Sequence, residues 1–215
     1  MADSLAVENL SKKYGGFTAL SPMNLNLQPG EIVVLSGQNG SGKTTLLSCI
    51  AGLTKPTTGT VRVGGYDLVL DEVEVRRRLA FIPDVPRFYV ELTAWEHLRF
   101  IAMANSALDG FDDRAERILQ MFGLWDVRDH FPHNYSRGMQ LKLGLAMAFI
   151  RPFEVLLLDE PTSALDEQSV GVLLEELTSL RDQGAGILMS SHDPAIKKQF
   201  GDRQLIIENG VLQEA

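Results

Sequence analysis

The chain has 215 residues, 45% of them hydrophobic, and a formal net charge of −8 at pH 7. This length allows one sizeable core, or one core with a smaller lobe. The acidic balance argues against nucleic-acid binding, because proteins of that class need clustered Lys and Arg to displace counterions from phosphates. The run Arg76–Arg78 is a local exception. Such a run is typical of the solvated face of a helix, and a docking role is the alternative.

The sequence lacks the patterns of a secretory signal and of a membrane span. The N-terminal MADSLAVENL has neither the basic segment nor the apolar core of a signal peptide. The apolar stretch 143–150 is far shorter than the roughly 20 residues that a span requires. The single cysteine, Cys49, agrees with a reducing compartment. We therefore expect a cytoplasmic protein whose association with a membrane would be peripheral.

The N-terminal part is predicted to form strands. Residues 5–10 and 17–27 are strand-like, and Pro29-Gly30 then turns the chain into a further strand. Tyr14 lies between the first two strands beside two glycines, where an exposed ring could stack on a purine. Most loop tyrosines have no such role, so Tyr14 alone is weak support for nucleotide binding.

Residues 31–53, EIVVLSGQNGSGKTTLLSCIAGL, contain a phosphate-binding pattern between a predicted strand and a predicted helix. The loop fits G-x-x-x-x-G-K-[ST], whose glycines let backbone N–H groups converge on phosphate oxygens at a helix N-terminus. Lys43 is placed to reach the β- and γ-phosphates, and the Thr44 hydroxyl to ligate Mg²⁺. The alternative is a glycine-rich turn with an incidental lysine. The candidate ATP-binding residues here are Gly37, Asn39, Gly40, Ser41, Gly42, Lys43, Thr44 and Thr45.

After this loop the pattern changes from alternating strands and helices to helices alone. Strands are expected over 60–63 and 79–82, and helices over 71–78, 94–107, 113–122 and 137–150. The prolines of the segment 83–86 break the regular structure. Thr93 and Glu96 fit a capping box at the start of the next helix. We interpret 84–151 as a helical lobe inserted into an α/β core.

The last helix of this lobe follows the segment 134–140, Asn-Tyr-Ser-Arg-Gly-Met-Gln. Ser136 is a good N-cap, and Gly138 leaves the backbone N–H groups of the first turn open to an anion. A capped helix with no further role is the alternative, and from the local pattern alone it is the commoner case.

Acidic residues follow the apolar run 155–158, which predicts a strand buried on both faces of a parallel sheet. Buried carboxylates need partners. A Mg²⁺ ion shared with Thr44 would supply one for Asp159, while Glu160 could polarise an attacking water. The alternative is a strand that ends in two solvated acids, and the phosphate loop upstream favours the functional interpretation.

A second core strand is predicted over 187–189 and is followed by His192. The carboxyl edge of an open α/β sheet is where ligands bind, so His192 could touch a γ-phosphate. Taken alone, His192 would more commonly be a surface histidine. Residues 205–208 and 211–212 predict a closing hairpin.

The ordered set GQNGSGKTT, YSRGMQ, VLLLDEPTSALD and SSHD resembles the ATP-binding cassette (ABC) ATPases, and the resemblance covers essentially the whole chain. It implies an α/β fold, with a P-loop NTPase core built on a mostly parallel sheet, an antiparallel β subdomain and an inserted α-helical subdomain. It implies a single ABC ATPase domain over 1–215, with the core in 1–83 and 152–215. The helical subdomain, 84–151, would carry the signature motif.

The resemblance also implies roles for single residues. Tyr14 would stack on adenine, and the loop 37–45 would bind the phosphates. The catalytic residues would be Glu160 as the base, His192 as the switch histidine and Lys43, with Asp159 and Thr44 holding Mg²⁺. The signature residues Ser136, Arg137, Gly138 and Met139 would contact ATP on the opposite subunit, and the loop Ser163–Asp166 would communicate across the dimer.

Two positions depart from the pattern that this family usually shows. Asp84 stands where the family usually has a glutamine that senses Mg²⁺ and the membrane subunit. It keeps a ligating oxygen and is a further candidate Mg²⁺ ligand, although its reach is shorter and its charge negative. Acidic residues at this place resemble an exporter-type branch. In the signature, Ser136 and Gly138 are kept, whereas Arg137 and Met139 differ from the usual L-S-G-G-Q.

These implications predict an ATP-binding and ATP-hydrolysing subunit of an ABC transporter, peripheral on the inner face of the cell membrane. ATP and Mg²⁺ are the expected cofactors. The expected partners are a second copy or a homologous ATPase subunit, and a multi-span permease docked near Asp84 and the helical subdomain, with no nucleic acid. One alternative is an ABC-type ATPase of a soluble complex. The other, motivated by Asp84 and the altered signature, is a nucleotide-sensing module with little turnover.

Overall fold

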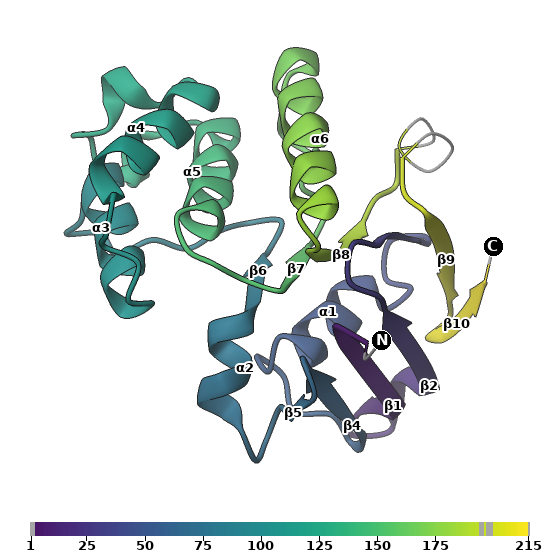
Figure 1. Cartoon of the computed structure of the whole chain (residues 1–215). Coiled ribbons are helices and arrows are strands. Elements are labelled where there is room, and N and C mark those ends of the chain that lie inside the picture. Colours follow the sequence, from purple (N-terminus) through teal and green to yellow (C-terminus); the bar gives the residue numbers. More distant parts are fainter. Residues whose placement is uncertain (1–2, 194–195, 197–199, 215) are drawn as a thin grey trace. The chain divides into compact units, whose positions relative to one another are not determined.

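The computed structural model describes residues 3–193, 196 and 200–214, and the chain folds as two compact units (Figure 1). The first unit combines the chain up to Phe81 with Phe153–Glu160 and the segment from Leu177 onward. The second unit consists of Ile82–Pro152 and Pro161–Glu176. The expected subdomain boundaries at 83/84 and 151/152 stay a prediction.

The larger sheet of the first unit is mostly parallel, with the strand order β10-β9-β3-β8-β7-β6. Its strands are β3 (Ile32–Ser36), β6 (Leu79–Ile82), β7 (Val155–Leu158), β8 (Gly186–Ser190), β9 (Arg203–Glu208) and β10 (Val211–Glu214). β3 is parallel to β8 and β9, β7 is parallel to β8, and β9 and β10 form an antiparallel hairpin. Every residue of β7 and β8 is buried, which explains their nearly continuous apolar sequences.

The smaller sheet is antiparallel and has the order β2-β1-β4-β5. Its strands are β1 (Leu5–Tyr14), β2 (Phe17–Leu27), β4 (Thr58–Val63) and β5 (Tyr66–Asp67). One face of this sheet shares a core with the larger sheet and with α1 (Lys43–Ile50), through side chains such as Leu5, Leu27, Leu35 and Leu46. The short helix α2 (Glu72–Arg78) adds Val75 to this core and forms ion pairs from Arg76 and Arg77 on its outer side.

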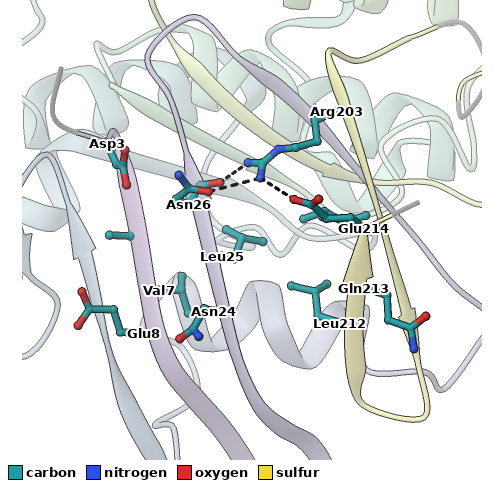
Figure 2. A pocket seen from close by; sticks show the side chains of 12 residues that line it. Asp3, Val7, Glu8, Asn24, Leu25, Asn26, Arg203, Leu212, Gln213 and Glu214 are labelled. Carbon is teal, nitrogen blue, oxygen red and sulfur yellow. Dashed lines mark hydrogen bonds and ion pairs between the residues drawn. The ribbon is translucent and has the colours of Figure 1, made fainter.

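Arg203 connects the two sheets of the first unit across a hollow of about 290 Å³ (Figure 2). Its guanidinium donates from Nε to Glu31 Oε1 at 2.8 Å and from Nη2 to the carbonyl oxygen of Asn26. Nη1 lies 3.8 Å from Glu214 Oε1 on β10. The edge strand β2 is thereby joined to the C-terminal hairpin.

The second unit is helical. It contains α3 (Ala94–Ala104), α4 (Phe111–Met121), α5 (Arg137–Phe149) and the short 3₁₀ turns Trp125–Val127 and Pro132–Asn134. The helix α6 (Glu167–Asp182) belongs to this unit as far as Glu176. The three helices α3, α4 and α5 pack on one another (Figure 1). The buried apolar side chains on these helices include Leu98, Ala102, Ile118, Leu119, Leu141 and Leu145.

The predicted fold class is confirmed: a mixed, mostly parallel sheet is combined with an antiparallel β part and helices. The capping box of α3 is also confirmed, since Thr93 accepts from the Glu96 N–H while Glu96 accepts from the Thr93 N–H. Tyr14 was expected in a loop, but it is the last residue of β1 and pairs with Phe17 of β2. No helix in the described part of the chain is both long and apolar enough to cross a bilayer.

Candidate active site

The phosphate loop joins β3 to α1, and two glycines hold it in a conformation that other residues would strain. Gly37 has φ 154° and Gly42 has φ 116°. A Cβ on Gly37 would lie 2.4 Å from the carbonyl oxygen of Ile207, and a Cβ on Gly42 would lie 2.8 Å from Leu20 Cδ2. The loop therefore lies so close to β2 and β9 that side chains at these two positions are excluded.

α1 begins at this loop without a side-chain cap. Gly42 is its N-cap residue and, as a glycine, has no side chain that could cap the first turn. The N–H groups of that turn are therefore available to an external acceptor, and the helix dipole favours an anion. The Ser41 hydroxyl is buried and has no hydrogen-bond partner among the described residues. Both features suit a loop that binds phosphate.

Lys43 folds back into the phosphate loop. Its Nζ donates to the carbonyl oxygens of Gly37 at 2.9 Å and Gln38 at 3.4 Å, and lies 3.7 Å from Glu160 Oε1. The residue is only 6% exposed, and a buried ammonium group is costly unless it is paired. The loop carbonyls and Glu160 together hold this positive charge beside the N-terminus of α1.

A serine hydroxyl links two acidic residues beyond the end of β7. Ser190, the last residue of β8, donates to Asp159 Oδ1 at 2.7 Å and accepts from the Glu160 N–H at 2.8 Å. Glu160 has φ 48°, a left-handed conformation that costs a non-glycine residue roughly 1–3 kcal/mol. The hydrogen bond from its own N–H to Ser190 helps to hold the Glu160 backbone in this conformation.

The Glu160 carboxylate lies between a lysine and a histidine. Its Oε2 accepts from the His192 N–H at 3.2 Å and lies 2.8 Å from His192 Nδ1, on the opposite oxygen from Lys43. The Glu160 side chain is 15% exposed, whereas that of His192 is 66% exposed. The structure thus brings all three predicted catalytic residues together at the carboxyl edge of the parallel sheet.

The remaining predicted ATP-binding residues lie nearer to solvent. Asn39, Gly40 and Thr44 are exposed, and Thr45 is half-buried. Tyr14 ends β1 with 52% of its surface exposed, and Lys12 Nζ lies 4.6 Å from the centre of its ring. Within the described residues, no hydrogen bond or ring contact joins Tyr14 to the phosphate loop.

Asp159 is the residue of this site best suited to hold a metal ion. Its carboxylate is 2% exposed, accepts from the neutral Ser190 hydroxyl and forms no ion pair with a described residue. No cluster of three or more His, Cys, Asp or Glu side chains occurs in the part of the chain that the structure describes. A metal here would therefore need other oxygen ligands, such as the Thr44 hydroxyl and phosphate oxygens.

The second unit carries the predicted signature residues and Asp84. Ser136 caps α5, with its Oγ accepting from the Met139 N–H at 3.2 Å. Asp84 Oδ1 and Oδ2 accept from Arg137 Nη2 at 3.0 and 3.1 Å, and Oδ1 also accepts from Ser163 Oγ at 2.7 Å. The structure therefore brings Asp84, Arg137 and Ser163 together, a grouping that no sequence pattern predicts.

The loop that precedes α6 packs on the first turns of α5. A Cβ on Gly138 would lie 2.7 Å from the carbonyl oxygen of Ala164, and Lys142 Nζ lies 3.4 Å from Asp166 Oδ2. Asp166 also accepts from the Ser169 N–H at 2.8 Å and so caps α6. This backbone hydrogen bond is the main reason that the pKa of Asp166 falls to about 2. Asp166 therefore stays charged at neutral pH.

Ser190 is the residue of the site that sequence analysis missed. The available signal was a polar residue at the end of the otherwise apolar strand β8. The sequence does not reveal how β8 pairs with β7. Only their parallel pairing in this register places Ser190 beside Asp159 and Glu160.

We predict that Ser190→Ala lowers the free energy of unfolding by roughly 1–3 kcal/mol, because buried polar groups of Asp159 and Glu160 lose their shared partner. Urea denaturation followed by circular dichroism measures this change. Ser36→Ala is the matched control, since the Ser36 hydroxyl at the end of β3 makes one longer bond, 3.3 Å to the carbonyl oxygen of Leu205. Equal destabilisation by the two substitutions would contradict the linking role of Ser190.

Comparisons with known proteins identify the family of this chain. The family model described as ABC transporter matches residues 20–163. The chain is 32% identical over 210 residues to the ABC-type transporter ATP-binding protein EcsA of Bacillus subtilis, covering 97% of this chain and 85% of EcsA. It is 34% identical over 213 residues to the SkfA peptide export ATP-binding protein SkfE of the same organism, covering 98% and 87%.

A solved structure described as the ATP-binding subunit of an ABC transporter superposes with a TM-score of 0.91 at 34% identity, covering 98% of this chain and 89% of that chain. Other relatives of similar identity are named for glutamine transport and for methionine import. The chain belongs to the ABC transporter family and is an ATP-binding subunit, an ATPase that energises transport.

Proposed function

We propose that this ATPase subunit hydrolyses ATP at the carboxyl edge of the parallel sheet, with the phosphate loop binding the phosphates and Glu160 serving as the general base. The observation that carries the proposal is the placement of the Glu160 carboxylate, 3.7 Å from Lys43 Nζ and 2.8 Å from His192 Nδ1. Lys43 sits in the loop that would bind the phosphates, so a carboxylate beside it is placed to act on water at the γ-phosphate.

Binding of ATP would exchange the partners of Lys43. The loop carbonyls that accept from Nζ carry no net charge, whereas phosphate oxygens are negatively charged, so hydrogen bonds of the ammonium group to phosphate join opposite charges and are stronger. Moving Lys43 towards phosphate would leave Glu160 Oε1 free to accept a proton from water. His192, on the other oxygen, would keep the carboxylate oriented and could also reach the γ-phosphate.

Asp159 and Thr44 would hold Mg²⁺. The Asp159 carboxylate is buried and has no cationic partner among the described residues, which supports this assignment, since a hard divalent cation would compensate its charge. When bound, the ion would neutralise charge that develops on the phosphate oxygens. Ser190 would orient the Asp159 carboxylate by the bond to its Oδ1.

The opposite side of the nucleotide would come from a second copy of the chain or a homologous ATPase subunit. Ser136 and Arg137 are exposed at the N-terminus of α5, where backbone N–H groups and the helix dipole favour an anion. Gly138 lies in that turn and has no side chain that could cover its backbone N–H groups. The first turn of α5 could therefore contact the phosphates of an ATP bound to the partner.

The second unit exposes apolar side chains where we propose that a multi-span permease docks. The residues following Asp84 and those on α3 include Val85, Tyr89, Val90, Phe100 and Met103, which are between 38% and 65% exposed. The rings of Tyr89 and Phe100 contact each other, with their centroids 5.5 Å apart, and exposed apolar side chains that cluster mark interaction sites. The docked subunit would be peripheral, on the cytoplasmic face of the membrane.

A buried histidine holds Tyr89 in this surface. His97 is fully buried, its Nε2 accepts from the Tyr89 N–H at 2.9 Å, and the two rings stack at 6.0 Å. Burial lowers the pKa of His97 below its usual 6.5, so the imidazole is neutral near pH 7 and keeps an acceptor for Tyr89. The docking surface is thus supported from beneath by a neutral side chain.

The acidic residue at position 84 supports an exporter-type assignment, and the similarity to SkfE, named for peptide export, agrees with it. Substrate movement into inverted membrane vesicles upon ATP addition is the expected result for an exporter. Movement out of such vesicles would assign the transporter to import.

We predict that Glu160→Gln slows phosphate release from ATP by about 100-fold or more while ATP binding persists, since the amide keeps the shape of the side chain and cannot accept the proton. Steady-state phosphate release and equilibrium binding of ATP measure the two effects. Glu154→Gln, on the surface of the same unit, is the control and keeps the parental rate. Turnover at the parental rate in Glu160→Gln would show that another group is the base. Chelation of Mg²⁺ is expected to stop turnover in the parental protein.

We predict that the double substitution Tyr89→Ser and Met103→Ser releases the subunit from membranes that contain its permease and leaves the ATPase rate of the free chain unchanged. The fraction that sediments with membranes measures the effect. Val211→Ser, an exposed apolar residue on β10, is the control. Equal release by the control, or equal sedimentation with vesicles of lipid alone, would contradict docking through this surface.

A further inference from the structure

The most unusual feature outside the phosphate loop is a carboxylate that three separate segments of the second unit share. Asp84 lies between β6 and α3, Arg137 is the first residue of α5, and Ser163 lies in the loop before α6. Arg137 Nη2 donates to both oxygens of Asp84, at 3.0 and 3.1 Å, and Ser163 Oγ donates to Oδ1 at 2.7 Å. We name this group the Asp84 clasp.

The Asp84 clasp fixes geometry rather than stability. The side chains of Arg137 and Asp84 are 60% and 37% exposed, and ion pairs as exposed as this contribute little to the free energy of unfolding. The sequence separation makes these contacts informative, because Arg137 is 53 positions from Asp84 and Ser163 is 79 positions from it. The Asp84 clasp therefore joins three segments that are far apart in the sequence.

Two further contacts join the same loop to α5. The carbonyl oxygen of Ala164 lies 2.7 Å from where a Cβ of Gly138 would be, so the backbones touch at the signature glycine. One turn further along α5, Lys142 Nζ lies 3.4 Å from Asp166 Oδ2. α5 and the loop 161–166 therefore contact each other along more than one turn. Through Asp84, the segment after β6 contacts both α5 and this loop.

The contacts of Asp84 argue against its use as a magnesium ligand. Both of its oxygens already accept hydrogen bonds, and a guanidinium lies against them. A divalent cation would have to displace that positive charge. The departure at position 84 and the departure at position 137 are then explained together, since an aspartate and an arginine form an ion pair that the usual glutamine and glycine could not form.

We propose that Asp84 is a positioning residue that couples the permease-docking segment to the signature turn and the dimer loop through Arg137 and Ser163. The proposal rests on the proposed function, in which the signature turn and the loop Ser163–Asp166 act across the dimer. Val85 of the docking surface directly follows Asp84, so displacement of that surface moves the clasp. The clasp would then shift the two elements that meet the second copy, while leaving the phosphate loop of its own chain unaltered.

A double-mutant cycle tests this coupling. Asp84→Ala and Arg137→Ala are each expected to lower kcat by about 3- to 30-fold, with the KM for ATP and the Mg²⁺ concentration for half-maximal rate changed less than twofold. The double variant is expected to be no slower than the slower single variant, because both substitutions remove one interaction. The charge exchange Asp84→Arg with Arg137→Asp is expected to recover part of the rate.

The matched control is Arg117→Ala, which removes an exposed arginine paired with Glu176 in the same unit and is expected to keep the parental kinetics. Independent, multiplying effects of the two single substitutions would overturn the proposal. A raised Mg²⁺ requirement in Asp84→Ala that Arg137→Ala does not share would overturn it as well, and would assign Asp84 to the metal.

Hydrogen exchange tests the clasp without relying on turnover. Exchange of the backbone amides in 162–166 is expected to accelerate in both Asp84→Ala and Arg137→Ala, and not in Arg117→Ala. Unchanged exchange in Asp84→Ala would overturn the coupling even if the parental protein hydrolyses ATP normally. If the parental protein shows no hydrolysis, the proposed function fails, whereas the exchange result still decides the clasp.

Discussion

The burial of charged groups at the carboxyl edge of one parallel sheet is the constraint on which the proposed active site depends. β3, β7 and β8 are apolar and almost wholly buried, so their polar residues can appear only where the strands end. Asp159 and Glu160 sit at that edge, and each must have partners there because an unpaired buried carboxylate is costly. Ser190 serves both residues, and Lys43 compensates Glu160.

The backbone conformation of Glu160 depends on the same buried contacts. A left-handed residue that is not glycine persists only where its surroundings hold it, and the Ser190 hydroxyl does so from the neighbouring strand. The side chain of Glu160 is then aimed along the edge between Lys43 and His192 rather than along the strand. Strain, hydrogen bonding and charge compensation therefore act on one residue, which is the pattern expected where a proton acceptor must be held in place.

Local chemistry made much of the molecule predictable from sequence. The phosphate loop, the capping box at Thr93 and the buried strand 155–158 are each specified by neighbouring residues. The contacts of Ser190 and of Asp84 are not, because they depend on strand register and on segments that meet only after folding. The helix α6 was also missed, since Gly171 and polar residues interrupt its apolar pattern and its buried face is marked mainly by Leu173 and Leu177. The family resemblance supplied roles for single residues that spacing alone could not.

We propose that each chain holds only part of a working ATPase site and that a second copy completes it. The most direct measurement is the rate of ATP turnover per chain as a function of chain concentration, with the oligomeric state followed by light scattering at each concentration. We expect the rate per chain to rise with concentration and to level off as ATP-bound dimers form. A constant rate per chain down to concentrations at which only monomers are present would contradict a site shared between two copies.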